Sequence, residues 1–390
     1  MRLLSILVLA AASTADQEKR GTFVFKQFVV QAHEVDRRWV LAEGTVEEAA
    51  VGPFRVFEAI TDKEVHSQID GRKIRWLVPF IAAKDKPRFD LRKGPATSPA
   101  LSLADGPEGS ISIKASDREI TRYYATTGKA NKKPCFYPLM AHGVNVLRCY
   151  PFEDRAGEAK DHPHQTGVYH AFGDVNGHEY WSKTDITNKR ILKKEAGPAY
   201  ARIIAENHWG EDLVEVQDIA ILNVGADAIM DWTITWTAAN GPVVLGKNQK
   251  MAKEGSFGVR VATELTRKGD APDMMVDALG NKGEKAIRAT NAPWVDYTGD
   301  FAGKKVGVSV MNHPSSFRYP GTWHVRAYGL FAANPWYFSE AKTVSWKEHT
   351  IAKGESLVLK YRVYVHTGDA QEGKVADVFA GYSHAAIAPE

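Results

Sequence analysis

Residues 357–366, which read LVLKYRVYVH, decide the fold class. Every second residue from Leu357 to Val365 is apolar, and a period of two is typical of a strand that buries one face. The same alternation recurs in residues 22–30, 111–124, 214–223, 232–236, 257–261 and 306–310. Turn-forming stretches such as Asn240-Gly241-Pro242 separate these segments. We therefore expect an all-β fold built from antiparallel strands.

The domain organisation follows from one break in this pattern. Residues 86–110 are rich in Lys, Pro, Gly and Ser and show no periodicity. We expect a small Ig-like β-sandwich at residues 16–104, and a large antiparallel β-sandwich at residues 105–390 that carries the active site. The number of strands in the large domain suggests an analogy with the galactose-mutarotase-like supersandwich. The clearest helix is the C-terminal segment 371–382, where Val375, Val378 and Phe379 lie at spacings of three and four.

The first fifteen residues have the pattern of a signal peptide. Arg2 precedes an apolar run at residues 3–12, and Ser13-Thr14-Ala15 places small residues before a cleavage point. This run is shorter than the ~20 residues that span a bilayer. We expect export to the periplasm or the cell exterior, and a disordered, mildly apolar N-terminus is the alternative. No other segment is apolar enough for insertion into a membrane.

Composition and charge argue against several classes of function. The formal net charge is +3, which gives no strong electrostatic case for binding nucleic acid or an anionic membrane. Two cysteines are too few for a disulfide-knotted scaffold or a four-cysteine metal site. The chain has no Gly-x-Ser-x-Gly, His-Glu-x-x-His or Walker motif, and no dinucleotide fingerprint in a βαβ context. Serine-hydrolase, zincin, NTPase and Rossmann dehydrogenase functions are therefore poorly supported.

Histidine is concentrated near the middle of the chain. Four of the 13 histidines fall between residues 162 and 178, and the densest segment is DHPHQTG at residues 161–167. In an extended backbone His162 and His164 point to the same face, and Pro163 favours an extended conformation at His162. Such a pair suits two metal ligands, or a general acid or base with its neighbour. The alternative is a polar turn with solvated imidazoles.

A second element, Asn312-His313-Pro314, repeats the Asx-His-Pro pattern at the end of a predicted strand. A sandwich brings distant strand ends to one rim, so we expect His162, His164 and His313 to converge on one catalytic pocket of the large domain. The same three histidines are the candidate ligands of a divalent metal ion. Glu254 is the candidate catalytic carboxylate, because the glycine after it permits close approach of a ligand. A surface Lys-Glu pair is the alternative for Glu254.

Substrate contacts are expected from cationic, polar and aromatic side chains near these segments. The planar fork of Arg148 suits a carboxylate or sugar hydroxyls, and tryptophan rings stack on the apolar face of sugars. Core packing is the alternative for the tryptophans. The candidate substrate-binding residues are Arg148, His170, Trp181, Trp323, His324, Arg326 and Asn334.

The two cysteines flank a predicted hairpin. Residues 135–140 and 144–149 have the pattern of strands joined at Ala141-His142-Gly143. A loop centred on His142 sets Cys135 opposite Cys149, within the Cα separation of a disulfide. We expect the two residues to be close and, in an exported chain, able to form a disulfide. Two separate thiols are the alternative, because the register can slip by one residue.

Seven motifs, taken in order, resemble a known bacterial family. They are PCFYPL (134–139), RCYP (148–151), DHPHQTG (161–167), GDVNGHEYW (173–181), NHP (312–314), WHVR (323–326) and GLFAANP (329–335). Together, over roughly residues 110–385, they resemble the family labelled PmoA or methane oxygenase, later treated as a domain of unknown function. The resemblance implies an exported protein of planctomycete-type bacteria, encoded near sugar-metabolism genes. Family members often carry a further histidine where this chain has Gln165.

The leading hypothesis is a secreted carbohydrate-active enzyme that cleaves or rearranges a glycosidic substrate, in the manner of a glycoside hydrolase. Such chemistry needs proton donors and acceptors near neutral pH, which histidine and a perturbed carboxylate supply. One alternative is a metal-dependent lyase acting on an oxidised sugar, and another is a non-catalytic glycan-binding or surface protein. The expected partner is an oligo- or polysaccharide, and a divalent metal ion is the one cofactor considered.

Overall fold

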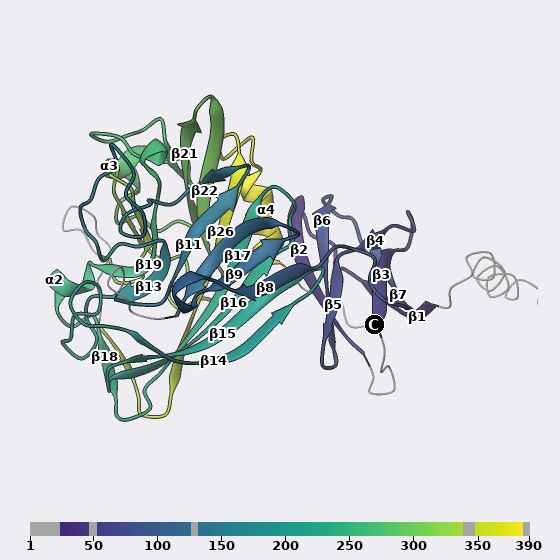
Figure 1. Cartoon of the computed structure of the whole chain (residues 1–390), viewed down its shortest axis with the longest axis horizontal. Helices are drawn as coiled ribbons and strands as arrows, with labels where there is room; N and C mark the ends of the chain where they lie inside the picture. Colours follow the sequence, from purple (N-terminus) through teal and green to yellow (C-terminus); the bar gives the residue numbers. More distant parts are fainter. Residues whose placement is uncertain (1–23, 47–52, 126–131, 338–347, 385–390) are drawn as a thin grey trace, which may run out of the picture. The chain divides into compact units, whose positions relative to one another are not determined.

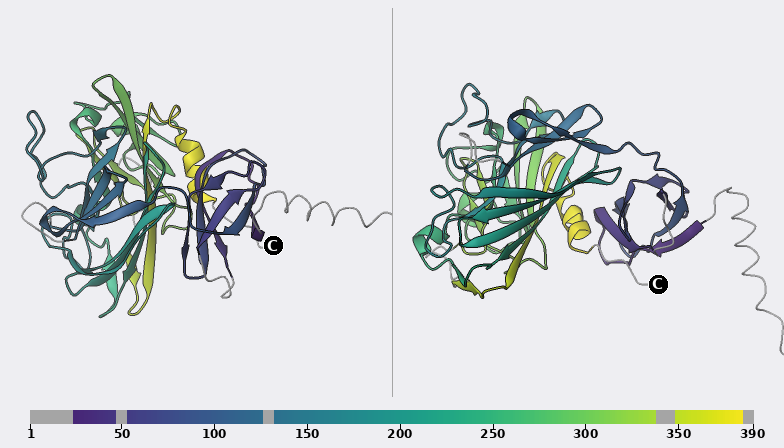
Figure 2. Two further views of the ribbon diagram at one scale, coloured as in Figure 1. Left: turned by 45° about the vertical axis from the view of Figure 1, so that its right-hand side comes forward. Right: turned by 60° about the horizontal axis from the view of Figure 1, so that its bottom comes forward.

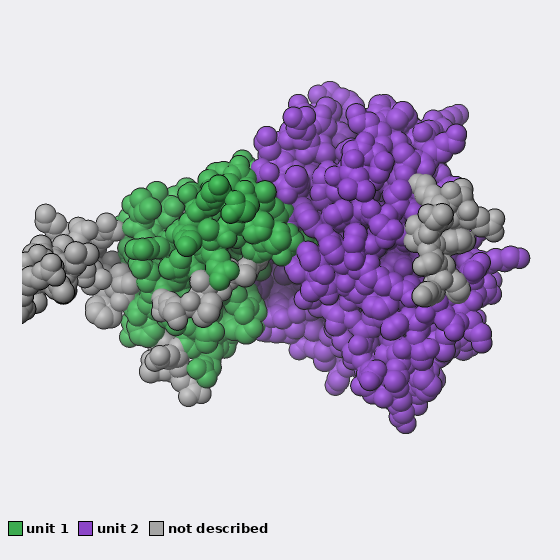
Figure 3. Space-filling model, turned by 180° about the vertical axis from the view of Figure 1, so that it is seen from behind, with its two compact units in different colours: residues 1–99, 197–199, 380–390 green, residues 100–196, 200–379 purple. Residues whose placement is uncertain are grey.

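The computed structural model describes residues 24–46, 53–125, 132–337 and 348–384 (Figure 1). The predicted signal peptide at residues 1–15 lies outside these ranges. The chain forms two compact units, which Figure 3 shows in different colours. Unit 1 comprises Met1–Pro99, Gly197–Ala199 and Ala380–Glu390, and unit 2 comprises Ala100–Ala196 and Tyr200–Phe379. The predicted all-β fold, with a small N-terminal sandwich, a large antiparallel sandwich and a C-terminal helix, is confirmed.

Unit 1 is a small β-sandwich of two antiparallel sheets, whose strands surround a common interior in the right-hand view of Figure 2. One sheet has the order β1-β7-β3-β4, with β1 (Val24–Val29), β3 (Phe54–Glu58), β4 (Glu64–Val65) and β7 (Arg88–Lys93). The other has the order β2-β6-β5, with β2 (Arg37–Thr45), β5 (Ser67–Asp70) and β6 (Lys73–Ile81). Trp76 is fully buried between them, with its ring centroid 5.1 Å from Phe28 and 5.5 Å from Phe89.

Unit 2 contains two large antiparallel sheets. The first has the order β23-β24-β19-β13-β11-β10-β9-β8, and β12 pairs with β11 beside this path. Its strands are β8 (Leu101–Asp105), β9 (Ile111–Ala115), β10 (Arg118–Tyr124), β11 (Cys135–Ala141), β12 (Val144–Asn145), β13 (Val168–Phe172), β19 (Gly255–Arg260), β23 (Trp323–Val325) and β24 (Leu330–Ala333). This sheet carries the loops that form the candidate site described below.

The second large sheet has the order β14-β15-β16-β17-β26-β22-β21-β20. Its strands are β14 (Thr187–Ala196), β15 (Tyr200–Trp209), β16 (Leu213–Leu222), β17 (Ala228–Thr237), β20 (Met275–Asp277), β21 (Trp294–Phe301), β22 (Lys304–Asn312) and β26 (Ser356–Thr367). A separate pair joins β18 (Val243–Leu245) to β25 (His349–Ile351). The strands predicted from alternation at 214–223, 232–236, 306–310 and 357–365 are thus neighbours in one sheet.

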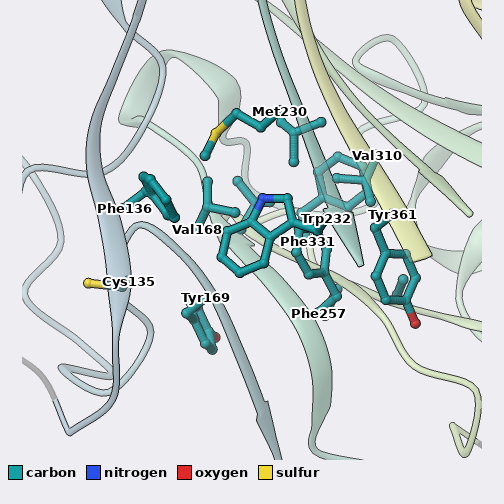
Figure 4. Close-up of a cluster of buried hydrophobic side chains, with 14 of the residues drawn as sticks. Cys135, Phe136, Val168, Tyr169, Met230, Trp232, Phe257, Val310, Phe331 and Tyr361 are labelled. Carbon is teal, nitrogen blue, oxygen red and sulfur yellow. The ribbon is translucent and has the colours of Figure 1, made fainter. Parts of the chain in front are cut away.

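Aromatic side chains from both large sheets meet in the core of unit 2 (Figure 4). Trp232 of β17 meets Phe136 of β11 and Phe257 of β19 edge to face, at centroid distances of 5.3 and 5.2 Å. Phe257 in turn stacks on Tyr361 of β26 at 4.7 Å. Because these rings are 0–1% exposed, truncating Trp232 to alanine would cost about 3–5 kcal/mol of stability.

The fold-deciding strand β26 is buried on both faces over its second half. Its alternating apolar residues face the core as predicted, but Arg362, Tyr364 and His366 on the other face are also 1–4% exposed. Arg362 forms a bidentate pair with Asp231 (Nε–Oδ1 2.6 Å, Nη2–Oδ2 2.8 Å). The Tyr364 hydroxyl donates to the carbonyl of Gly373 at 3.1 Å, so the turn before the last helix covers this face.

The predicted C-terminal helix is α4 (Val375–Ser383), which begins four residues later than its apolar spacing suggested. Asp369 holds the residues just before the helix in a turn, because its carboxylate accepts the backbone N–H groups of Gln371 and Glu372 at 3.0 Å. Lys374 has a positive φ of 55°, which ends the turn and starts the helix. The other described α-helices are the short α2 (Gln249–Ala252) and α3 (Gly283–Ile287). No helix among the described residues is long and apolar enough to cross a membrane.

Cys135 and Cys149 are free cysteines, which is the alternative given for them in the sequence analysis. The hairpin that joins their strands pairs Met140 with Asn145 and Ala141 with Val144, one residue away from the predicted register. The connection is a two-residue turn at His142 and Gly143, both with positive φ (51° and 82°), as a type I′ turn requires. β12 also ends at Asn145, so no ladder places Cys149 opposite Cys135.

Candidate functional site

A pocket of about 460 Å³ in unit 2 collects six of the predicted site residues, together with seven others. Its walls are the segment before β13, the turn after β13, α2 with the residue before β19, and β23 with its turn to β24. The predicted residues that line it are His162, His164, Trp181, Glu254, His324 and Arg326. The residues that sequence reasoning missed are Gln165, Glu179, Ser182, Lys183, Lys250, Met251 and Tyr328.

Two buried arginines organise the histidine-rich segment from behind. Arg148 donates hydrogen bonds to the carbonyls of Asp161 (2.6 Å), His162 (3.0 Å) and Gln165 (2.8 Å), and to Asp161 Oδ1 (2.9 Å). Arg260 of β19 donates to Gln165 Oε1 (2.8 Å) and to the same Asp161 Oδ1 (2.9 Å). Both side chains are only 1–2% exposed. Arg148 therefore does not stand at the pocket wall as predicted, because its guanidinium holds the loop that forms the wall.

Asp161 and His162 form a dyad at the mouth of the pocket. Asp161 Oδ2 lies 2.5 Å from His162 Nδ1, and the imidazole stacks on Tyr328 with ring centroids 5.4 Å apart. Burial alone would raise the pKa of Asp161, but the His162 hydrogen bond and the charges of Arg260 and Arg148 hold that pKa below its ordinary value. A carboxylate on Nδ1 orients the ring and favours Nε2 as the reactive nitrogen.

His162 and His164 both line the pocket, although not through the extended geometry predicted. His162 has a φ of 44°, which is the left-handed region, and the two rings meet edge to face with centroids 5.7 Å apart. Burial, reinforced by the charge of Lys133, lowers the pKa of His164 to about 3. His164 is therefore a neutral imidazole at physiological pH. Its role as an acid would require a charged form that this environment disfavours.

Lys133 is a wholly buried cation that joins two walls of the pocket. Its ammonium donates to the carbonyl of His164 at 3.0 Å and to that of Trp181 at 2.6 Å. It also lies 4.7 Å from the ring centroid of Tyr169 and 5.4 Å from that of Trp181. Burial lowers the pKa of Lys133 to about 7. The side chain thus ties the histidine segment to the turn that carries Trp181.

Glu254 and His324 face each other across the floor of the pocket. Glu254 Oε2 lies 3.9 Å from His324 Nδ1, and the Glu254 side chain is one third exposed. Burial raises the pKa of Glu254 above its ordinary value. The position of Glu254 is fixed by a close backbone approach, in which its carbonyl accepts the N–H of Gly173 at 2.8 Å. A Cβ on Gly173 would lie 2.1 Å from the carbonyl oxygen of Met251, so only glycine fits there.

His324 has an unsatisfied acceptor aimed at this floor. The side chain is 3% exposed and stacks on Tyr337 with centroids 4.6 Å apart. Its Nδ1 is buried without a hydrogen-bond partner among the described residues, while the ring bonds the backbone of Lys253. Burial, together with the charges of Arg326 and Arg288, lowers the pKa of His324 well below its ordinary value. His324 is therefore a neutral imidazole, and a ligand hydroxyl would satisfy Nδ1.

Three predicted site residues are structural instead. His170 is buried in the core, with Nδ1 2.6 Å from Glu215 Oε1. Trp323 is also buried, and its indole N–H donates to the carbonyl of Ala292 at 2.9 Å. Asn334 donates to the carbonyls of Ala252 (3.0 Å) and Lys253 (3.1 Å), so it positions the chain just before Glu254.

His313 does not reach the pocket. It follows β22 in the other large sheet, where its backbone N–H donates to Lys360 of β26 and its Nδ1 lies 2.9 Å from the Ser315 hydroxyl. The two Asx-His-Pro elements therefore belong to different sheets: the one at residues 161–163 precedes β13, and the one at residues 312–314 lies at the end of β22. The sequence pattern alone does not show this difference. Among the described residues, no three His, Cys, Asp or Glu side chains form a group that could hold a metal ion.

Comparison with known proteins places the chain in a family but assigns it no activity. The model of a family of unknown function, DUF6807, matches residues 110–380. This match corrects the resemblance to a PmoA or methane oxygenase family described above. No curated protein matches the chain. Among solved structures, an α-mannosidase from Enterococcus faecalis V583 is similar, with 11% identity and a TM-score of 0.43. The match covers 97% of this chain and 48% of the mannosidase, so the chain spans about half of that protein's length. On the match over residues 110–380, this chain belongs to the family DUF6807, a family of unknown function.

Proposed function

We propose that this pocket is the active site of an exported carbohydrate-active enzyme that cleaves or rearranges a glycosidic substrate. The observation that carries the proposal is the pair on the pocket floor. A carboxyl with a raised pKa, Glu254, lies 3.9 Å from a buried imidazole nitrogen for which the described part of the chain offers no hydrogen-bond partner. A carboxyl whose pKa is raised keeps its proton to a higher pH and so suits a proton donor, and the imidazole nitrogen can hold a sugar hydroxyl.

The roles of the pocket residues follow from their surroundings. Glu254 is the proton donor to the leaving oxygen, because burial favours its neutral form. The dyad of Asp161 and His162 is the base, since Asp161 stabilises the imidazolium that forms when Nε2 takes a proton from a water or a hydroxyl. His324 holds the sugar through Nδ1 and exchanges no proton. Hydrolysis and elimination both fit this pair of acid and base.

Export is part of the proposal and rests on the signal-peptide pattern of residues 1–15. The dyad, the Glu254 carboxyl and the aromatic edges of Trp181 and Tyr328 all belong to unit 2. We therefore propose that unit 2 carries the chemistry.

The test is a screen of the purified protein on a panel of neutral and acidic oligosaccharides, with detection of products by mass spectrometry. On any substrate found, Glu254→Gln should lower kcat by about 10²–10⁴-fold, the usual contribution of a general acid. Glu355→Gln is the matched control, because Glu355 is exposed and does not line the pocket. Full activity in Glu254→Gln would overturn the assignment. Sugar binding without any product would favour the glycan-binding alternative.

A further inference from the structure

The charges around the pocket do not cancel. Arg326 is paired with Glu284 at 3.3 Å, and Lys253 lies 3.9 Å from Glu254. Both oxygens of Glu179 accept hydrogen bonds from Ser182, which fixes that carboxylate in the wall. Glu179 and Glu254 are the two carboxyl groups of the pocket lining, and burial favours the neutral form of Glu254.

Two lysines of the pocket lining have no opposing charge beside them among the described residues. Lys183 and Lys250 are exposed at the pocket, and neither forms an ion pair with a carboxylate of the described residues. The backbone of Lys250 is fixed near the opening, because its main-chain N–H donates to the Oδ1 of Asn248, the N-cap residue of α2. Two exposed ammonium groups at an opening attract an anion from solution.

Two further cations, Arg148 and Arg260, lie behind the lining near the carboxylates of Asp161 and Glu158. Arg148 and Arg260 share a single carboxylate oxygen, Asp161 Oδ1, and both arginines are buried. Charges held behind a wall of low dielectric are weakly screened, so they act on whatever enters the pocket.

One cation of the floor has the geometry for a carboxylate. Arg326 comes two residues after His324, lines the same pocket and is 24% exposed. Its only described side-chain partner is the Glu284 carboxylate, reached through Nη1. A guanidinium that keeps further N–H groups available binds a planar carboxylate in a bidentate manner, which an ammonium group cannot do.

We propose that the ligand of this pocket is an acidic sugar, a residue that carries a ring carboxylate, as hexuronates do. Arg326 receives the carboxylate, Lys183 and Lys250 attract it, and His324 Nδ1 accepts one hydroxyl of the same sugar. This inference rests on the proposed function, which it narrows from glycosides in general to uronate-containing ones.

The test is titration calorimetry of the full chain at two salt concentrations. Three probes are compared: oligosaccharides of galacturonic or glucuronic acid, the same oligosaccharides after chemical reduction of their carboxyl groups, and sulfated neutral oligosaccharides. We expect the acidic form to bind at least tenfold more tightly than the reduced form, with an advantage that shrinks as salt rises. Equal affinity of the acidic and reduced forms would overturn the proposal. Preference for the sulfated probe would show an anion site of a different chemistry and would also overturn it.

Single substitutions test which side chains of the pocket bind the carboxylate of the acidic probe. Arg326→Gln and Lys250→Gln should each weaken binding of the acidic probe about three- to tenfold, a larger factor than for the reduced probe. Lys268→Gln is the control, because Lys268 is exposed and does not line the pocket. If neutral sugars bind and Glu254→Gln abolishes their turnover, the proposed function stands and only the acidic ligand fails. If no sugar of any charge binds or reacts, the proposed function itself fails.

Discussion

Replacing Arg148 with methionine should loosen the whole histidine segment. The guanidinium makes four hydrogen bonds of 2.6–3.0 Å to Asp161, His162 and Gln165, and it is 2% exposed. Burial and the nearby Arg260 lower the pKa of Arg148 to about 10, so the group is still charged at neutral pH. Methionine keeps most of the apolar contact but leaves three carbonyls without their donor.

The magnitude follows from the three carbonyls that lose their donor, since Asp161 is 40% exposed and keeps its bonds to Arg260 and His162. A polar group left unsatisfied costs about 1–3 kcal/mol, so we expect the free energy of unfolding of unit 2 to fall by about 3–5 kcal/mol. The assay is urea denaturation followed by tryptophan fluorescence, with wild type and variant compared at the same pH. Arg190→Met is the matched control, because Arg190 pairs with Glu206 at 2.7 Å but is 65% exposed, and should cost less than about 1 kcal/mol. A loss below 1 kcal/mol in Arg148→Met would refute the assigned role.

Three further predictions concern protonation and the cysteines. The ring of His164 should show no titration in NMR spectra between pH 5 and 8, because burial lowers its pKa to about 3; a chemical-shift change centred near pH 6 would contradict the neutral assignment. Asp296 raises the pKa of buried His366 despite the opposing effect of burial, so this pair should stabilise the fold fully below pH ~6.5 and lose its contribution as pH rises through the raised value. The destabilisation caused by His366→Gln should therefore be larger at pH 6 than at pH 9, and the opposite trend would argue against a charged pair. Finally, adding a reductant should leave Tm unchanged, because Cys135 and Cys149 form no disulfide; a drop of several degrees would show that a bond exists.

The strands were predictable because alternation directly reports which face of a strand is buried. Residues 357–365 became the centre of β26, and Trp232, Ile234 and Trp236 face the core as their spacing required. The register of short hairpins was not predictable, since it changes with the pairing of one residue, Ala141, which pairs with Val144 and leaves a two-residue turn. The second buried face of β26 was also missed, because Arg362 and His366 look like solvent-facing residues until their partners Asp231 and Asp296 are placed.

The candidate site was predictable where its residues are close in sequence or lie in unusual motifs. His162 and His164 stood out through their density, and His324 and Arg326 through the motif WHVR. Lys133 and Arg260 could not be assigned, because burial of a charge is visible only once its partners are known. The sequence does offer one weak signal for Arg260, which is the lone charged residue in the stretch Gly255–Arg260 (GSFGVR). His313 is the opposite case: the sequence predicted it for the site, but a repeated tripeptide does not reveal which sheet carries each copy.

A crystal structure of the Glu254→Gln variant with an oligosaccharide substrate bound would test whether this pocket is the active site. We predict that the sugar occupies the pocket between His162 and His324, with its glycosidic oxygen ~2.6–3.2 Å from the side chain at position 254 and a hydroxyl on His324 Nδ1. A sugar bound elsewhere, for example in the 540 Å³ pocket lined by Met275 and Trp294, would contradict the assignment.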